Sequence, residues 1–420
     1  EDDCILLQLL AMCLDGCFLQ VPWPCGASIE DDWDQLDLDY DMEASPFNLL
    51  LVPPICTATL YRAKEIPLDF LKGRVRQIVE ANPWLGGRLR KSCGRPFLAV
   101  PPSPGNHFME CSSSFTMSSG ADFHDLSQHV LESEATLKCG LLALNQNEQL
   151  FRVAVIPANP DHFLLVVSLN HTIGDGYTFY KLYSMLEPNA SILQMNPLRQ
   201  SGFACLAEQC IGESQFNWLT TCPTMLGLLR SFCLWHPPKP EVRYVDQDWL
   251  ASLKSQDASL STNDILTSHL LTKSRFGYGY MSINLRNRGL GADDANAGNY
   301  VHRVHLAPGD FAEPDGVRKS ISEPFRFRGQ DAVPGCWESI TTSHGLVSNW
   351  ASLFYEVSLP GSQHLSHMPI LSYPQPGFGL LLIFKPRRDE LAVYYYIRNK
   401  AAFEDASSSP MFGSSFNPFA

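Results

Sequence analysis

Two short apolar runs, at residues 150–157 and 162–170, constrain the fold of this chain more than any other feature. Both are rich in β-branched and aromatic residues, and the turn-forming residues 158–161 separate them. This pattern predicts a β-hairpin. Residues 177–186 follow with the apolar spacing of a helix. A strand pair that leads directly into a helix indicates a mixed α/β fold.

The same two kinds of segment recur along the chain. An early strand at 47–61 contains Pro53 and Pro54, which predicts an edge strand or a bulge. Ser261 begins a cluster of helix-capping residues ahead of an apolar run. The remaining expected elements are strands at 278–285, 380–385 and 391–397, and helices at 67–81, 224–235, 265–272 and 345–355.

The chain has 420 residues, which is too long for one ordinary core and suits two domains. Prolines recur between 187 and 245. We therefore expect an N-terminal domain at 1–190, a crossover linker at 191–245 and a C-terminal domain at 246–405. The serine-rich segment 406–420 is expected to be a flexible tail.

Composition excludes several classes of function. The net charge of −13 argues against nonspecific binding to nucleic acid or to an anionic membrane. The 13 cysteines are scattered and odd in number, which favours reduced thiols and a cytoplasmic location. Residues 4–22 are apolar, but Asp15 interrupts them, so no transmembrane segment is expected. Residue 1 is Glu rather than Met, which is compatible with an earlier removal of a leader.

The segment 168–176, Ser-Leu-Asn-His-Thr-Ile-Gly-Asp-Gly, carries the strongest chemical signal. His171 stands where an apolar strand meets a turn and a helix. Burial keeps an imidazole neutral, so it can accept a proton near pH 7. Gly174 and Gly176 allow a tight backbone path beside it, and Asp175 can fix the loop.

The His-x-x-x-Asp-Gly pattern after an apolar strand resembles the signature of the CoA-dependent acyltransferase superfamily. That group includes the BAHD enzymes, chloramphenicol acetyltransferase and the condensation domains of peptide synthetases. Further segments agree in order, and the resemblance covers about residues 30–400: 33–36, 82–89, 261–267, 284–288 with 298–299, and 348–350. Residues 358–363, Ser-Leu-Pro-Gly-Ser-Gln, replace the Asp-Phe-Gly-Trp-Gly of BAHD enzymes. The chain thus resembles a divergent member.

The resemblance implies two chloramphenicol acetyltransferase-like domains, each a mixed β-sheet flanked by helices, with an active-site tunnel between them. His171 would be the general base, and Asp175 would form a structural ion pair with Arg286, or with Arg288 as second choice. Ser348 is the candidate donor to the oxyanion. The other implied substrate-binding residues are Gly176, Trp350, Thr267 and Asn299, together with the two arginines.

The implied reaction moves an acyl group from acyl-CoA, as co-substrate, to a hydroxyl or amine of a small molecule. No bound cofactor and no metal are expected, and the protein is expected to be a monomer. Cations of the second half are the candidates for the CoA phosphates: Lys273, Arg275, Lys385, Arg387 and Arg388.

Two alternatives stay open. One is a condensation-type enzyme whose thioester donor sits on a carrier protein, but a doubled histidine would favour it, and Asn170 precedes His171 here. The other is a non-catalytic binding protein on the same fold. Nucleophile-elbow, phosphate-loop and zinc-protease motifs are not found in the sequence. His364 and His367 are interpreted as surface loop histidines rather than metal ligands.

Overall fold

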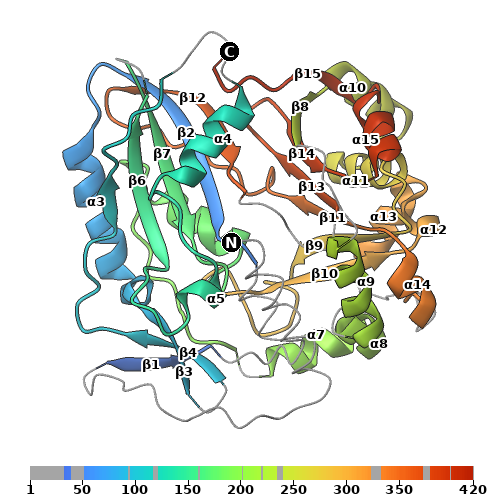
Figure 1. Cartoon of the computed structure of the whole chain (residues 1–420), viewed down its shortest axis with the longest axis horizontal. Helices are drawn as coiled ribbons and strands as arrows, with labels where there is room; N and C mark the ends of the chain where they lie inside the picture. The colour runs from blue at the N-terminus through green and yellow to red at the C-terminus, as the bar shows by residue number, and fades with distance from the viewer. Residues whose placement is uncertain are drawn as a thin grey trace.

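The computed structural model confirms a mixed α/β fold built on two large β-sheets, which lie on the left and right of Figure 1. It describes residues 33–38, 52–92, 95–116, 122–158, 161–200, 202–218, 221–233, 240–322, 333–371, 379–397 and 399–419. None of the described helices combines the length and apolar character needed to cross a bilayer.

The first sheet has five strands in the order β12-β2-β7-β6-β5. The expected hairpin is its centre, because β6 and β7 pair in antiparallel register. The strands are β2 (Ile55–Ala63), β5 (Phe108–Glu110), β6 (Phe151–Pro157), β7 (His162–Leu169) and β12 (Ser362–Pro369). A separate three-stranded sheet contains β1 (Asp34–Asp37), β3 (Arg88–Ser92) and β4 (Arg95–Val100).

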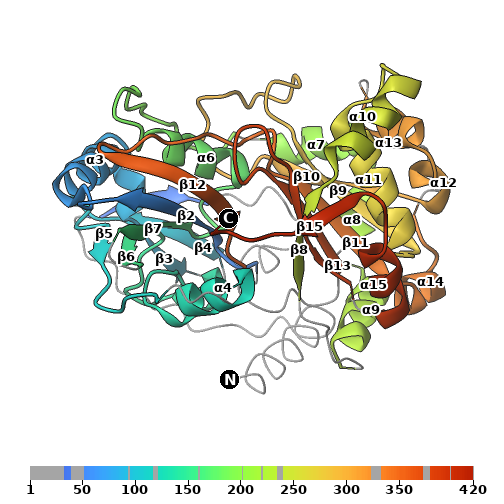
Figure 2. The same cartoon turned by 90° about the horizontal axis from the view of Figure 1, so that it is seen from above.

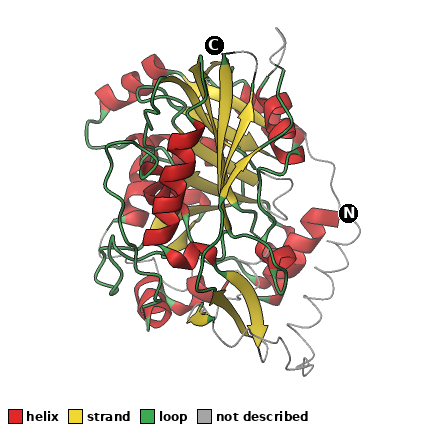
Figure 3. Cartoon of the chain, turned by 90° about the vertical axis from the view of Figure 1, so that its left-hand side faces the viewer, coloured by secondary structure: helices red, strands yellow, loops and turns green. Residues whose placement is uncertain are grey.

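Helices cover both faces of the five-stranded sheet. The outer face packs against α3 (Leu68–Ala81), which lies toward the viewer in Figure 3, and against α6 (Gly176–Ser184). The predicted helix at 67–81 is α3, and Asn82 ends it before Pro83. The inner face packs against α4 (Phe123–Glu132). Two short helices, η1 (Pro83–Gly86) and α5 (Gly140–Ala143), complete this half.

The second sheet has seven strands in the order β10-β9-β11-β13-β14-β8-β15. The strands are β8 (Glu241–Val245), β9 (Tyr278–Asn284), β10 (Val301–Leu306), β11 (His344–Asn349), β13 (Gly379–Phe384), β14 (Ala392–Tyr396) and β15 (Phe412–Ser415). Strand β11 runs parallel to both neighbours, and the other pairs are antiparallel, so the sheet is mixed.

Helices pack on the outer face of the seven-stranded sheet. Ser261 caps α11 as the sequence predicts, and Asp264 completes the reciprocal capping box. The helices of this half are α7 (Phe203–Ile211), α8 (Glu213–Trp218), α9 (Cys222–Cys233), α10 (Gln247–Gln256), α11 (Thr262–Lys273), α12 (Pro308–Phe311), α13 (Pro314–Ile321), α14 (Cys336–Thr341) and α15 (Lys400–Ser407).

The inner faces of the two sheets share one apolar layer. Ala58 and Leu164 of the first sheet belong to the same buried cluster as Leu346 and Leu380 of the second. Successive side chains of a strand point to opposite faces. Tyr280 therefore joins this layer, whereas its neighbour Met281 packs under the outer helices.

Three sequence predictions are wrong. The segment 345–355 is not a helix, because it contains most of β11, which lies between β9 and β13, and a turn follows that strand. The tail is not loose throughout, since β15 pairs with β8. The predicted C-terminal domain is not continuous in space, because β12 pairs with β2 of the first sheet, as Figure 2 shows.

The early strand also differs from the prediction. Strand β2 starts at Ile55, after Pro53 and Pro54, and lies between β12 and β7 rather than at an edge. Both prolines thus precede the paired residues of β2, so their missing N–H groups remove no hydrogen bond between strands. Residues 47–51 lie outside the described residues.

Close packing at one aromatic ring yields a test of the second sheet. Gly345 and Gly379 are register partners on β11 and β13, and a methyl group on either would overlap the Phe276 ring. We expect Gly345→Ala to lower the free energy of unfolding by about 1–3 kcal/mol. Gly73→Ala is the control: it lies inside α3 with open space around it, and should raise stability by about 0.5–1 kcal/mol. Thermal unfolding measures both, and equal effects would contradict this packing.

Candidate active site

His171 stands in the tight turn that joins β7 to α6. The preceding residue, Asn170, is buried and holds that turn. Its Oδ1 accepts hydrogen bonds from the Thr172 backbone N–H and hydroxyl, at 3.0 and 2.6 Å. Its Nδ2 donates to the carbonyl of Lys138 at 2.9 Å. The His171 side chain is half-buried, so it keeps some access to solvent.

The side chain of Asn299 fixes the tautomer of His171. Its Nδ2 donates to the backbone carbonyls of His171 and Thr172, at 2.8 and 3.3 Å. Because carbonyl oxygens only accept, this sets the orientation of the amide. The Asn299 Oδ1 then lies 3.1 Å from Nδ1 of His171 and accepts its proton. Nε2 is left with a lone pair, which makes it the basic atom of the ring.

Desolvation is the largest effect on the pKa of His171 and lowers it below the usual 6.5. The positive charge of Arg303 lowers it as well. A hydrogen bond to its own backbone, the charge of Asp175 and the contact with Asn299 act in the opposite direction, and the net pKa is still lowered. The imidazole is therefore neutral at pH 7 and able to accept a proton.

Asp175 and Arg286 form the ion pair that the sequence predicts, with both side chains at most 1% exposed. Nη1 donates to Oδ2 at 2.7 Å and Nη2 to Oδ1 at 3.2 Å. The carboxylate also accepts from the backbone N–H groups of Thr178 and Tyr300, at 3.0 and 2.9 Å. Burial alone would raise the pKa of Asp175, but Arg286 and these donors hold it below its ordinary value.

Arg286 is satisfied on every side. It donates to the carbonyls of Asn296 and Gly298 at 3.1 and 3.0 Å, and it packs against the rings of Tyr177 and Tyr300. These contacts join the turn after β7 to the segment between β9 and β10. The pair thus links two distant segments of the chain next to His171.

Two other predicted residues, Ser348 and Trp350, reach the layer between the sheets. Ser348 pairs with Leu382 on β13, so it shares the inner face of the second sheet and is half-buried. Trp350 packs against the apolar cluster on the outer face of the first sheet and against the cluster between the two sheets. Its ring also makes an edge contact with the ring of Tyr180. Gly176 is the first residue of α6, directly after Asp175.

Two predicted substrate-binding residues are not brought to His171. Thr267 is fully buried between α11 and the outer face of the second sheet, where its hydroxyl contacts the sulfur of Met281. Arg288 donates to the carbonyl of Asn284 at 2.9 Å, and Arg286 takes the carboxylate instead.

The five candidate cations for CoA fall into two groups. Phe276 packs on Gly379 at the start of β13, so Lys273 and Arg275 lie near that end. The second group, which contains Lys385, Arg387 and Arg388, follows the last residue of β13. The six residues of β13 span roughly 20 Å, and this distance separates the two groups. Arg275 pairs with Asp405, Arg387 pairs with Glu390, and Lys385 donates to the Arg388 carbonyl. The two groups therefore cannot converge on one phosphate.

The histidines at 364 and 367 lie on β12, not in a surface loop as predicted. His367 is 1% exposed and bonds with Thr59 at 2.9 Å and with the Tyr180 hydroxyl at 3.0 Å. Among the described residues, no group of three or more His, Cys, Asp or Glu side chains is placed to hold a metal ion.

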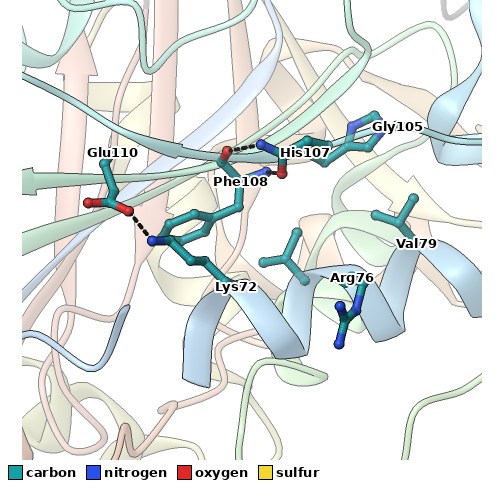
Figure 4. A pocket seen from close by; sticks show the side chains of 9 residues that line it. Lys72, Arg76, Val79, Gly105, His107, Phe108 and Glu110 are labelled. Carbon is teal, nitrogen blue, oxygen red and sulfur yellow. Dashed lines mark hydrogen bonds and ion pairs between the residues drawn. The ribbon is translucent and has the colours of Figure 1, made fainter. Parts of the chain in front are cut away.

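Neither the contact of Asn299 with His171 nor the position of Arg303 was predicted from the sequence. Asn299 could have been found, because its segment belongs to the recognised Gly-Asn block. No motif marks Arg303. A pocket of about 500 Å³ lies apart from these residues, between α3 and the segment 105–110 (Figure 4), and the Lys72–Glu110 ion pair spans it.

Comparison of the fold with solved structures gives strong matches over most of the chain. The structure of F. graminearum TRI101 complexed with coenzyme A and T-2 mycotoxin matches with a TM-score of 0.61 and 13% identity, over 90% of this chain and 97% of that one. Vinorine synthase matches at 0.58 and 14%, over 94% and 96%. The first condensation domain of the CDA synthetase matches at 0.54 and 13%, over 87% and 94%.

No protein-family model matches the sequence, and no curated protein matches it either. The likeness therefore lies in the fold, which these structures share across nearly their whole length. This chain has the two-domain fold of the BAHD and chloramphenicol acetyltransferase-like acyltransferases, at 13–14% sequence identity to the three structures named above.

Proposed function

We propose that this protein transfers an acyl group from an acyl-CoA thioester to a hydroxyl or amine of a small molecule, with His171 as general base. The observation that carries the proposal is the orientation of His171: Asn299 holds the proton on Nδ1 and leaves Nε2 free. The shared fold with TRI101, whose structure holds coenzyme A and a small molecule, supports it.

The proposed reaction is a direct transfer. Nε2 of His171 takes the proton of the acceptor as its oxygen or nitrogen attacks the thioester carbon. The carbonyl oxygen becomes an oxyanion, for which Ser348 is the proposed hydrogen-bond donor. The C–S bond then breaks, and the thiolate takes the proton back from Nε2. The sequence carries no nucleophile motif beside His171, so we propose a ternary complex rather than an acyl-enzyme.

The identity of the acyl donor, a CoA thioester, is part of the same proposal. CoA phosphates would be held by one of the two cation groups, and Lys273 and Arg388 are exposed. A carrier-protein thioester is the second candidate, because the condensation domain shares the fold. Against it, Asn170 is committed to the turn, at the position where a doubled histidine would stand. We further propose that the protein is a cytoplasmic monomer with an active-site tunnel between its two domains.

Removing the base should abolish turnover. We expect His171→Ala to slow acyl transfer roughly a hundred- to ten-thousandfold, because general-base help is worth that much. Its melting temperature should stay near that of the wild type. The assay incubates a panel of acyl-CoA donors with a metabolite extract and measures release of the CoA thiol. His124→Ala on α4 is the control and should keep full activity. An active His171→Ala variant would refute the enzyme proposal.

Neutralising Asp175 should act through structure. Asp175→Asn leaves the buried Arg286 without its charge partner, which costs about 3–5 kcal/mol. A small shift of the turn can also cost roughly a hundredfold in rate. We expect lower activity and a lower melting temperature together.

The double variant Asp175→Asn with Arg286→Met removes both charges and should recover part of the lost stability. Activity should stay low, because the turn loses its anchor. If Asp175→Asn kept the wild-type melting temperature yet lost all activity, Asp175 would act on the chemistry directly.

The pH profile should show one acid limb. His171 must be neutral to accept a proton, and its pKa lies below 6.5, chiefly through desolvation. Activity should therefore be flat from pH 7 to 8 and fall as the pH drops through that lowered pKa. Rates are measured from pH 5 to 8, with circular dichroism at each pH as the control for unfolding. An acid limb centred above pH 7 would contradict the burial of this base.

A further inference from the structure

Arg303 lies on the face of the second sheet that turns toward His171. It is on β10, where its register partner on β9 is Ser282. Two residues along, His305 pairs with Tyr280, which belongs to the layer between the sheets. Residues two apart on a strand share a face. The side chain of Arg303 therefore points toward the first sheet, from the strand that follows Asn299.

Arg303 lies four residues after Asn299, whose Oδ1 is 3.1 Å from Nδ1 of His171. Its charge acts on His171 strongly enough to contribute to the lowered pKa of that base. Ser282 directly follows Met281, which pairs with Val347 on β11. Continuing that register by one residue puts Ser348, the proposed oxyanion donor, at the same level of the sheet. Arg303, Ser348 and His171 thus border one region.

Within the described part of the chain, Arg303 forms no hydrogen bond and no ion pair. Arg286 shows the contrast, since its guanidinium meets a carboxylate and several carbonyl oxygens. Besides His171, the groups that interact electrostatically with Arg303 are Tyr280, His302 and His305, and burial lowers the pKa values of the last two to about 3. These neighbours are uncharged at pH 7, so they do not compensate its charge.

Arg303 is also reachable. Its surroundings desolvate it enough to lower its pKa, yet the side chain is only half-buried, as is His171. A guanidinium held in such a place without an anion costs free energy, and a planar carboxylate matches its two parallel N–H donors. Arg303 thus offers its guanidinium to an anionic group, with no carboxylate of the described residues paired to it.

We propose that Arg303 binds a carboxylate group of the substrate, carried by either the acyl chain or the acceptor, next to His171. The inference rests on the proposed acyl transfer and names its substrate class. A carboxylate in the acyl chain would make the donor a dicarboxylic acyl thioester. A carboxylate on the acceptor would make it a hydroxy or amino acid.

The experiment compares matched substrates that differ in the carboxylate alone. Succinyl-CoA is set against butyryl-CoA as donor, and a panel of hydroxy acids is set against their methyl esters as acceptor. The proteins are the wild type, Arg303→Met, Arg303→Lys and the control Arg76→Met, an exposed arginine of α3. Release of the CoA thiol gives kcat/KM, and calorimetry gives binding of each compound.

We expect the wild type to favour the carboxylate member of one pair. Arg303→Met should lose roughly ten- to hundredfold in kcat/KM and affinity for that member, since a charge-assisted hydrogen bond is worth that much. It should change little for the neutral member. Arg303→Lys should recover part of the preference, and Arg76→Met should behave as wild type. Arg303→Met should melt at or above the wild-type temperature, because it removes an uncompensated charge.

Other results overturn the inference. Equal losses for both members of a pair would mean that Arg303 acts on the shared step, as an oxyanion stabiliser does. No carboxylate preference in either pair, by rate or by binding, would also refute it. If no thioester is turned over, the acyl-transfer proposal fails, and the binding data still decide whether Arg303 recognises a carboxylate.

Discussion

The buried ion pair between Asp175 and Arg286 is the interaction on which the site depends. Two charges taken out of water are costly unless each meets its partner and further donors or acceptors. Here the carboxylate caps α6, and the guanidinium reaches the carbonyls of Asn296 and Gly298. Satisfying both charges forces the turn after β7 and the segment before β10 to meet. That meeting brings Asn299 to His171.

Arg286 and Arg303 lie close together in the sequence, but only the charge of Arg286 meets an anionic partner among the described residues. Arg286 is fully paired, so its charge stabilises the surrounding backbone. Arg303, close to it in sequence, has no anionic partner among the described residues. The first arrangement is what a positioning residue needs. The second leaves interaction energy available to a ligand, because an anion that reaches Arg303 replaces water rather than a protein carboxylate.

Local signals in the sequence predicted much of the fold. The amphipathic helix α3, the β6–β7 hairpin and the Ser261 cap each depend on neighbours within a few residues, and all are present. The failures involve distant partners. The segment 345–355 contains β11, whose state is set by pairing with β9 and β13, and β12 crosses to the first sheet. Arg303 was not predicted, because no sequence motif shows which side chains of one sheet point toward the other sheet.

The environment of Arg303 determines how strongly it can act. Burial lowers the pKa values of His302 and His305, both of which interact with the Arg303 charge, to about 3, so both rings are neutral at physiological pH. Trp218 and Tyr280 pack against the ring of His305 and add no charge. A charge among neutral, desolvated groups is weakly screened, so its attraction for an anion is larger than at the surface. The net charge of −13 therefore does not oppose an anionic substrate, because the deciding field is local.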